Sequence, residues 1–183
     1  MFHMEYNLDN LKMEIVLILL RYTRLHVREI ANKLKTNHTT ILRKTREMMG
    51  SNVLDFEVEG KNKIFFIRNS EEARDYIHLA ERYKKIKILD KYPLLRKVVE
   101  TIRKNKKIKL AILFGSYAKG TAKKDSDIDI FIETKNKKLK QEISKIGSLL
   151  SIKIGTYSGS SELKREIDKN HVILKGIEEY YGK

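Results

Sequence analysis

The chain has 183 residues and a formal net charge of +15, because 39 Lys and Arg face 24 Asp and Glu, and it contains no cysteine. The lack of thiols excludes a disulfide framework, a cysteine nucleophile and Cys-ligated metal centres, and it suits a reducing cytoplasm. The longest apolar run, Ile15–Leu20, is far shorter than the roughly 20 residues of a membrane-spanning helix, and no signal-peptide pattern is seen. We therefore expect a cytoplasmic protein without a membrane partner.

The first 70 residues carry a helical period that changes to a strand period. The elements expected here are a helix at Leu8–Tyr22, a second at Val27–Leu34, a third from an Asn37 N-cap to about Met49 with Gly50 as its stop, a strand at Leu54–Glu59, a turn at Gly60–Lys63 and a returning strand at Ile64–Ile67. Three short helices followed by a hairpin are the pattern of a winged helix-turn-helix domain.

The segment Glu29–Leu34 followed by Thr39–Arg43 resembles the helix-turn-helix of that superfamily, with Lys35 where glycine is common. The resemblance implies binding of double-stranded DNA by a homodimer, since such domains commonly pair to match half-sites. The side chains expected to contact DNA are Thr39, Thr40, Arg43, Lys44 and Arg46 on the third helix, and Lys61 and Lys63 at the wing tip.

Two observations keep another role for this domain open. Asp55, Glu57 and Glu59 line the polar face of the wing, where they would repel phosphate. Winged-helix domains also serve as protein–protein modules, because a fold does not fix a function. The net positive charge is equally compatible with a solvated Lys-rich surface and with a polyanionic partner.

The remaining chain is expected to form a connecting helix and a second domain. We expect the first domain at residues 1–70, a long helix at 71–92 ending before Pro93, and the second domain at 93–183. In the second domain the pattern predicts strands at Ile108–Phe114, Ser126–Glu133 and Ser151–Tyr157, helices at about 137–150 and 160–169, and a short apolar segment at Val172–Leu174 before a terminal turn. The fold class is therefore two-domain α+β, with an α/β second domain around a mixed sheet.

One stretch of the second domain carries a phosphate-binding pattern. An apolar strand leads into Gly115-Ser116, where glycine permits a close backbone approach and the N–H groups of a helix start attract phosphate. Asp127 and Asp129 follow at alternate positions, so a strand would present both carboxylates on one face. Mg²⁺ is commonly held by one or two carboxylates together with phosphate oxygens.

This stretch resembles the signature of the polymerase-β-like nucleotidyltransferases, which is a Gly-Ser pair, ten intervening residues and then Asp-x-Asp, here Gly115-Ser116 and Asp127 with Asp129. The segment from Gly115 to Gly120 is similar to the minimal nucleotidyltransferases of archaea and bacteria, with Lys119 where arginine is usual. The resemblance implies that Gly115, Ser116 and Lys119 hold the triphosphate of an NTP, ATP being our expectation, and that Asp127 and Asp129 are catalytic ligands of Mg²⁺ or Mn²⁺. It also implies transfer of NMP to a hydroxyl, with a HEPN-type protein as a candidate partner in a toxin–antitoxin pair.

The sequence departs from this family in a second respect. Active members carry a third carboxylate on the strand after the next helix, but Ser151–Tyr157 contains no acid and places Lys153 there. Glu133, Glu162 and Asp168 do not lie where the pattern requires an acid. Two hypotheses therefore stand: a metal-dependent nucleotidyltransferase with a DNA-binding domain, or a transcription regulator whose degenerate nucleotidyltransferase domain senses NTP.

Overall fold

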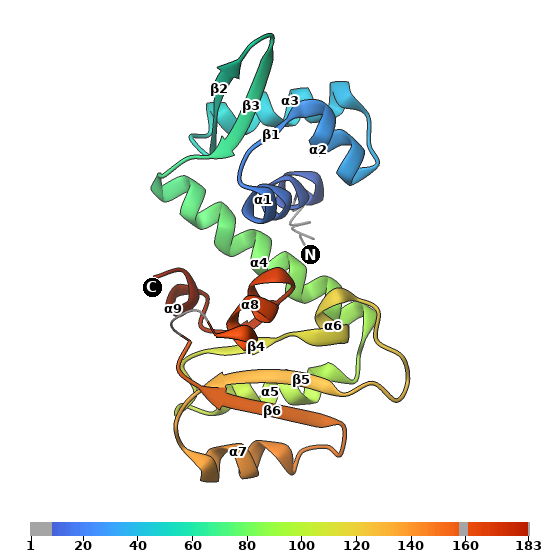
Figure 1. Cartoon of the computed structure of the whole chain (residues 1–183), viewed down its shortest axis with the longest axis vertical. Coiled ribbons are helices and arrows are strands. Elements are labelled where there is room, and N and C mark those ends of the chain that lie inside the picture. Colours follow the sequence, from blue (N-terminus) through green and yellow to red (C-terminus); the bar gives the residue numbers. More distant parts are fainter. Residues whose placement is uncertain (1–8, 158–160, 183) are drawn as a thin grey trace, which may run out of the picture. The chain divides into compact units, whose positions relative to one another are not determined.

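The computed structural model describes residues 9–157 and 161–182. The chain divides into two compact units, Met1–Tyr83 and Lys84–Lys183, and the long helix α4 (Glu71–Lys91) runs through the division (Figure 1). The division lies inside the segment for which a connecting helix is expected. Each unit has its own buried core and is described by itself below.

The N-terminal unit combines three helices with a small antiparallel sheet. The helices are α1 (Asn10–Tyr22), α2 (Val27–Leu34) and α3 (His38–Gly50), and the strands β1 (Leu25–His26), β2 (Leu54–Glu59) and β3 (Asn62–Ile67) lie in the order β1-β3-β2. Leu8, the expected start of the first helix, lies outside the described residues. Because Glu59 pairs with Asn62, the hairpin turn is Gly60-Lys61, and the expected four-residue turn is too long.

Local capping explains where the helices of this unit begin and end. The side chain of Asn37 accepts a hydrogen bond from the Thr39 N–H at 2.7 Å, which fixes the start of α3 as expected. Lys35 closes α2 in the left-handed conformation, with φ of 51°, at the position where related turns often carry glycine. Gly50 does not stop α3, because it is the last helical residue and Ser51 is the cap.

The core of the N-terminal unit is built from one face of every helix. Its innermost members are fully buried and apolar: Ile15, Leu19, Ile30, Ile41, Met48, Leu54 and Phe65. Ala73 and Ala80 on the first half of α4 join this cluster, so that half of the helix belongs to the N-terminal core.

The C-terminal unit is a four-stranded mixed sheet with helices on both faces. Its elements after α4 are α5 (Leu95–Lys104), β4 (Ala111–Leu113), α6 (Gly115–Lys119), β5 (Ile128–Glu133), α7 (Lys137–Ser144), β6 (Leu150–Gly155), α8 (Glu162–Lys169), β7 (Val172–Lys175) and α9 (Ile177–Tyr181). The strand order is β6-β5-β4-β7; β5 and β6 are parallel, whereas β4 is antiparallel to both of its neighbours. The expected mixed sheet is confirmed.

The two faces of this sheet have different covers. Helices α5 and α7 pack on one face, where Ile102 and Ile143 meet Ile130 and Ile152. Helices α8 and α9 pack on the other face, and there Ile167 belongs to the cluster that contains Phe131. Figure 1 shows α7 and α8 on opposite sides of the sheet. The second face is the one that carries the candidate site.

Several expected boundaries in this unit are wrong. The strand expected over Ile108–Phe114 shortens to Ala111–Leu113, beside a register shift in its pairing with β7. The next strand begins at Ile128 rather than Ser126, because Ser126 closes a turn with Lys123. The helix expected over 137–150 ends at Ser144, and residue 160 of the next expected helix lies outside the described residues.

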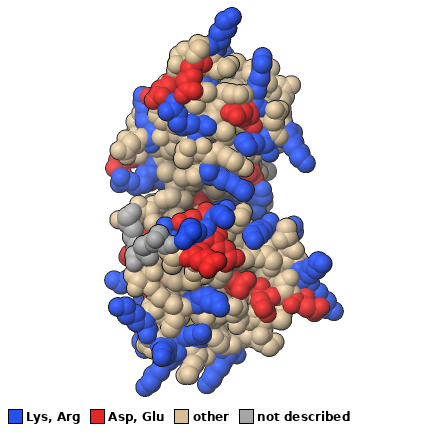
Figure 2. Space-filling model, viewed as in Figure 1, with Lys and Arg blue, Asp and Glu red and all other residues tan. Residues whose placement is uncertain are grey.

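The structure bears on two expectations, which concern a membrane-spanning helix and the placement of the positive charge. Within the described residues, no helix has the length and apolar character needed to cross a bilayer. On the face drawn in Figure 2, Lys and Arg side chains are spread over both units with acidic side chains between them. The excess of positive charge therefore does not gather into one continuous patch on that face.

Candidate functional site

The end of β4 and the start of β5 bring Gly115 against Asp129. Gly115 has a φ of +68°, and a Cβ placed on it would lie 3.2 Å from Cγ of Asp129 and closer still to the carboxylate. The Phe114 N–H donates to the Asp129 carbonyl oxygen at 3.0 Å, which locks the two segments together. Only glycine allows this approach, because a side chain would both strain the backbone and displace the carboxylate.

Asp129 shares its sheet face with residues of β6. In the parallel register Asp129 lies opposite Ser151, and Phe131 lies opposite Lys153. The intervening Ile152 is buried on the opposite face with α5 and α7, so alternation places Ser151 and Lys153 on the face of Asp129. A Cβ on Gly155 would contact the Phe131 ring at 3.8 Å, which confirms that this face is continuous.

Three charged side chains act on the half-buried Asp129 carboxylate. Burial raises the pKa of Asp129 above its usual value, and the negative charges of Asp127 and Glu166 raise it further. A hydrogen bond from Ser151 and the positive charge of Lys153 lower that pKa, but they do not cancel the rise. Carboxylates that repel one another in a partly buried place are costly, and such clusters are typical of sites that bind a cation or a substrate.

Asp127 and Asp129 are not both on the strand. Asp129 is the second residue of β5, whereas Asp127 precedes the strand and its side chain is exposed. The sequence pattern placed Asp127 on the strand, but Asp127 lies just before it. Its negative charge still acts on Asp129. The candidate site therefore contains one exposed carboxylate, Asp127, and one half-buried carboxylate, Asp129, which lies against Gly115.

Gly115 and Ser116 are the first two residues of α6, and contacts of this helix and of the turn after it hold them in place. The Ser116 carbonyl oxygen accepts from the Thr121 N–H at 3.0 Å, and the Lys91 ammonium donates to the Gly120 carbonyl oxygen at 2.7 Å. Tyr117 is buried edge-on against Tyr92, with ring centroids 4.9 Å apart. Ser116 is partly exposed at the start of the helix.

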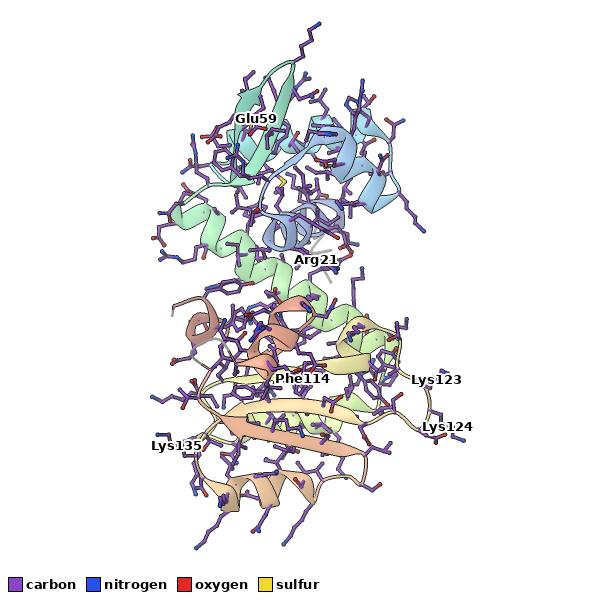
Figure 3. All side chains as sticks on the ribbon, viewed as in Figure 1. Arg21, Glu59, Phe114, Lys123, Lys124 and Lys135 are labelled. Atoms are coloured by element: carbon purple, nitrogen blue, oxygen red, sulfur yellow. The ribbon has the colours of Figure 1, made fainter. Side chains whose placement is uncertain are left out.

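Three lysines follow the Gly115-Ser116 segment along the chain: Lys119, Lys123 and Lys124. Lys119 is exposed at the end of α6. Lys123 and Lys124 lie on the loop that leads to β5 and point away from the sheet (Figure 3). The structure therefore brings Gly115, Ser116 and Asp129 together, and it leaves Lys119 on the surface of the same segment.

The two aspartates suit one divalent cation. An exposed and a half-buried carboxylate, repelling each other beside a glycine that keeps the space next to them clear, are the oxygen ligands that Mg²⁺ and Mn²⁺ prefer. Among the described residues, however, no three His, Asp or Glu side chains are grouped so that they could hold a metal ion together. The residues present fit a metal that takes its other ligands from phosphate and water.

Sequence reasoning missed two residues of this site. Ser151 is found only through the β5–β6 register, and Glu166 comes from α8, whose position over the sheet no local pattern predicts. Two acids near the motif in sequence have other partners. Glu133 accepts a hydrogen bond from the Tyr157 N–H at 3.0 Å, and Asp168 binds the Tyr157 hydroxyl and the Lys164 ammonium.

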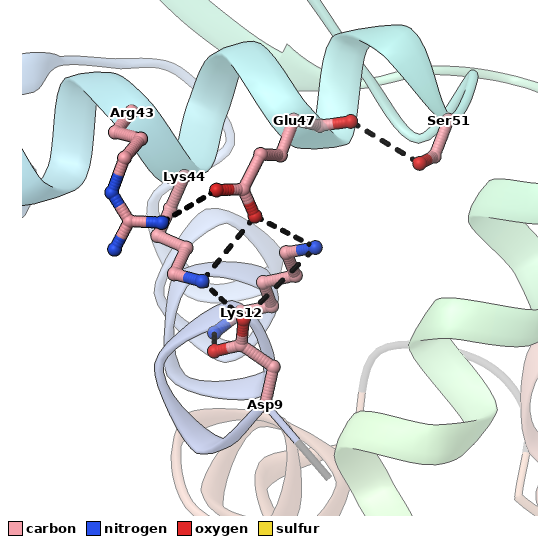
Figure 4. Close-up of polar contacts among 6 residues, drawn as sticks. All are labelled: Asp9, Lys12, Arg43, Lys44, Glu47 and Ser51. Carbon is pink, nitrogen blue, oxygen red and sulfur yellow. Dashed lines mark hydrogen bonds and ion pairs between the residues drawn. The ribbon is translucent and has the colours of Figure 1, made fainter. Parts of the chain in front are cut away.

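The α3 side chains that are expected to contact DNA differ in their exposure and in their ion pairs. Lys44 points toward α1, where its ammonium pairs with Asp9 and with Glu47 at 3.3 Å, and only 14% of its side chain is exposed (Figure 4). Arg43 is ion-paired to Glu47 at 2.7 Å but keeps 62% of its side chain exposed. Arg46 and Thr39 are exposed, and Thr40 is partly exposed.

The same network holds α1 to α3. Glu47 receives the Lys12 ammonium at 3.0 Å as well as Lys44 and Arg43. The hydrogen bond from Lys12, joined by that from Lys44, lowers the pKa of Glu47 to about 2. Lys44 therefore serves the packing of the two helices, which differs from the expectation that it reaches DNA.

The acidic side chains of the wing have arginine partners. Arg24 pairs with Glu57 at 2.6 Å and with Glu59 at 2.7 Å, and Arg68 pairs with Asp55 at 2.6 Å. Lys61 is exposed at the two-residue turn, while the Lys63 ammonium lies 4.0 Å from the centroid of the Phe56 ring. The repulsion that these acids would exert on phosphate is therefore largely neutralised within the unit.

Comparison with known proteins finds two similarities. Residues 96–179 match the family model described as "Polymerase beta, Nucleotidyltransferase". The "Putative protein adenylyltransferase MJ1215" of Methanocaldococcus jannaschii is 48% identical over 40 residues, which are 22% of this chain and 46% of that protein. The match thus spans about half the length of that relative. The similarity to a polymerase beta nucleotidyltransferase domain covers residues 96–179, all of which lie in the C-terminal unit.

Proposed function

We propose that this protein binds an NTP, with ATP as the first candidate, and a divalent cation at Gly115, Ser116, Asp127 and Asp129, and transfers NMP to a hydroxyl group. The observation that carries the proposal is the packing of Gly115, in the left-handed conformation, against the Asp129 carboxylate. It places a backbone that can approach phosphate beside the residue that can hold the cation. Lys119, exposed at the end of α6, is proposed as a further phosphate contact.

The proposed reaction requires little chemistry from the side chains themselves. An oxygen of the acceptor forms a bond to the α-phosphorus, the bond from that phosphorus to the bridging oxygen breaks, pyrophosphate leaves and the hydroxyl proton passes to solvent. Asp127 and Asp129 would hold a divalent cation, which would neutralise part of the phosphate charge. Gly115 and Ser116 orient the triphosphate, so positioning provides most of the remaining acceleration.

The name of the relative suggests the class of acceptor. That protein is described as a protein adenylyltransferase, and the stretch it shares with this chain is 40 residues long. We propose a protein hydroxyl as the acceptor here as well, and a HEPN-type protein is one candidate. The acceptor is found by incubating the protein with ATP labelled at the α-phosphate and a candidate protein, and by locating the labelled residue by mass spectrometry.

Nucleotide binding is tested first by thermal melting with each of the four NTPs, with and without Mg²⁺. A ligand that binds only the native state raises the melting temperature as RT ln(1 + [L]/Kd) predicts. We expect a Mg²⁺-dependent rise in the wild type that Asp127→Asn removes. Asp125→Asn, at an exposed acid two residues earlier, is the matched control and should retain the rise. No rise with any NTP in the wild type would overturn the proposal.

For the N-terminal unit we propose a winged helix-turn-helix domain that binds double-stranded DNA, most simply as a homodimer. Its element order and its three-stranded antiparallel sheet support this assignment. The exposed side chains of Thr39, Arg43 and Arg46 supply contacts on α3, and Lys61 and Lys63 supply them on the wing. Arg24 and Arg68 favour the proposal, because they neutralise the wing carboxylates.

DNA binding is tested by the double variant Arg43→Ala, Arg46→Ala. We expect weaker binding and a salt dependence whose slope falls by about one for each phosphate that the variant no longer neutralises. Lys35→Ala, outside α3, is the control for removal of a nearby positive charge. Unchanged affinity and slope in the double variant would favour the protein–protein role for this unit.

A second candidate function rests on Lys153. Since no acid stands on β6 facing Asp129, the domain would sense NTP without transferring it, and the protein would be a DNA-binding regulator. The two candidates differ in one result. A sensor binds Mg²⁺–NTP and changes its DNA affinity without forming pyrophosphate, whereas a transferase releases pyrophosphate when its acceptor is present.

A further inference from the structure

Lys153 shares the face of the sheet around Asp129 with acidic side chains. Asp127 and Glu166 are each close enough to act electrostatically on Asp129, and Lys153 is a basic residue that acts on the same carboxylate. Lys153 is exposed on β6, and Phe131 lies opposite it on β5, one pleat beyond the Asp129–Ser151 pair. Its side chain therefore starts from the correct face of the sheet.

Strand geometry shows that the ammonium can reach the site. Neighbouring strands lie about 4.8 Å apart and residues two apart on a strand about 6.6 Å apart, so the Cα atoms of Asp129 and Lys153 are separated by about 8 Å. A lysine side chain extends roughly 6 Å from its Cα and moves freely when it is exposed. The ammonium can thus reach the space beside Asp129 while the strand remains unchanged.

The charge of this face changes when a triphosphate and one cation bind. Three carboxylates alone would repel a triphosphate, and one divalent cation leaves a triphosphate with net negative charge. A positive group on the protein is then needed close to the phosphates, and lysine is a common phosphate ligand. Lys153 has the position and the charge for this task.

We propose that Lys153 binds the triphosphate directly, so that its ammonium replaces a second metal ion and the site works with a single divalent cation. This inference rests on the proposed NTP site and names one more of its ligands. It also explains why β6 carries no carboxylate toward Asp129: an acid there would hold a second cation, whereas a lysine makes that cation unnecessary. Glu166, exposed on α8, adds a negative charge that acts on the same Asp129 carboxylate.

The proposal is tested by measuring the affinity of Lys153→Gln for α,β-methylene-ATP, which cannot be cleaved at the α–β bond, and for AMP. Removing a hydrogen bond between charged groups should weaken binding of the triphosphate about 10-fold or more. AMP affinity should change less than about 2-fold, because AMP has neither the β- nor the γ-phosphate. Lys153→Arg should restore most of the affinity for the triphosphate.

The matched control is Lys140→Gln on α7, which covers the opposite face of the sheet. It removes the same charge from the unit and should leave both affinities unchanged. If Lys153→Gln binds the triphosphate as tightly as the wild type, or if its affinity for AMP falls to the same extent, the proposal is wrong. The melting temperature without ligand shows whether each variant is folded.

Counting bound Mn²⁺ by electron paramagnetic resonance gives a second, independent measurement. We expect one Mn²⁺ per molecule of α,β-methylene-ATP on the wild type and a second on Lys153→Glu, which restores an acid to β6. Two Mn²⁺ on the wild type would overturn the inference and leave the proposed function intact. Absence of any metal-dependent nucleotide binding by the wild type would instead overturn the proposed function itself.

Discussion

The two units of this protein use charge in opposite ways. On α3 of the N-terminal unit, Glu47 is surrounded by Lys12, Arg43 and Lys44, so that nearly every charge has an opposite partner. On β5 of the C-terminal unit, Asp129 is close to two further carboxylates, and burial together with their repulsion raises its pKa. Paired charges hold elements of a fold together, whereas like charges gathered in a partly buried place weaken it.

This difference distinguishes charged groups with a structural role from charged groups with a proposed functional role. A cluster that costs stability can persist where a ligand removes the repulsion, and the carboxylates near Gly115 fit the cation site proposed above. The network around Glu47 needs no ligand to explain it. Lys44 matched the pattern for a DNA contact in the sequence, but its ion pairs assign it to the joint between α1 and α3.

The largest effect is expected from Asp129→Asn. Removal of this proposed metal ligand should reduce nucleotidyl transfer by roughly 100-fold or more, because a bound cation would stabilise the transition state by several kcal/mol. The same change removes a repelled negative charge, so the ligand-free protein should melt at a higher temperature than the wild type at pH 7. Pyrophosphate release and thermal melting measure the two effects.

The sign of that stability effect follows from the raised pKa of Asp129. Its carboxyl is easier to protonate in the folded state, so its contribution to stability is most favourable at low pH and is lost as the pH rises above 3.8 through the raised value. Asp125→Asn serves as the control and should change neither transfer nor melting. An Asp129→Asn protein that is less stable and fully active would show that the charges of this unit are structural, like those of α3.

An intermediate effect is expected from Gly115→Ala compared with Gly120→Ala. Both glycines have positive φ, of +68° and +74°, so both variants carry backbone strain of about 1–2 kcal/mol. At Gly120 the new Cβ meets the flexible end of Lys91 at 3.6 Å, but at Gly115 it collides with the Asp129 carboxylate. Gly115→Ala should therefore be less stable than Gly120→Ala by about 1–3 kcal/mol.

Hydrogen exchange of the β4 and β5 amides measures this difference within the C-terminal unit alone. Gly115→Ala should also fail to bind NTP, because the displaced carboxylate no longer lies beside the phosphate-binding backbone. Equal stability of the two variants would mean that Asp129 can move away freely and that its packing against Gly115 is not a fixed part of the site.

The smallest effect is expected from Glu47→Gln, and it is clearest in the response to acid. The lowered pKa of Glu47, about 2 against 4.5, gives the folded N-terminal unit a stabilisation that is present above about pH 5 and is lost as the pH falls toward 2. Glu47→Gln should melt lower than the wild type at pH 7 and should show a weaker loss of stability between pH 5 and 2.

Glu71→Gln, at an exposed ion pair on α4, is the control and should keep the acid-dependent loss of the wild type. Melting of the N-terminal unit followed by exchange of the α3 amides gives the comparison. If Glu47→Gln retains the full pH dependence, the paired charges of α3 contribute less than their short distances indicate, as is common for exposed ion pairs.

Local signals in the sequence determined most of the helices and strands and the main residues of the candidate site. Alternating apolar residues predicted β2 and β5, and the Asn37 cap predicted the start of α3, because these features depend on a few neighbouring residues. The Gly115-Ser116 pair and the two aspartates follow from the chain alone for the same reason. Element ends were less well predicted, since Ser126 closes a turn that no periodicity records.

Only the tertiary structure decided which charges face one another. The parallel register of β5 and β6 puts Ser151 beside Asp129 and Lys153 one pleat further along, and the packing of α8 brings Glu166 to the same carboxylate. Lys44 is a second example. The helical pattern predicts only that Lys44 lies on α3, whereas the packing of α1 against α3 turns its side chain inward to Asp9. Electrostatic effects depend on distances between residues far apart in the chain, so the sequence names the charged groups and the fold selects their partners.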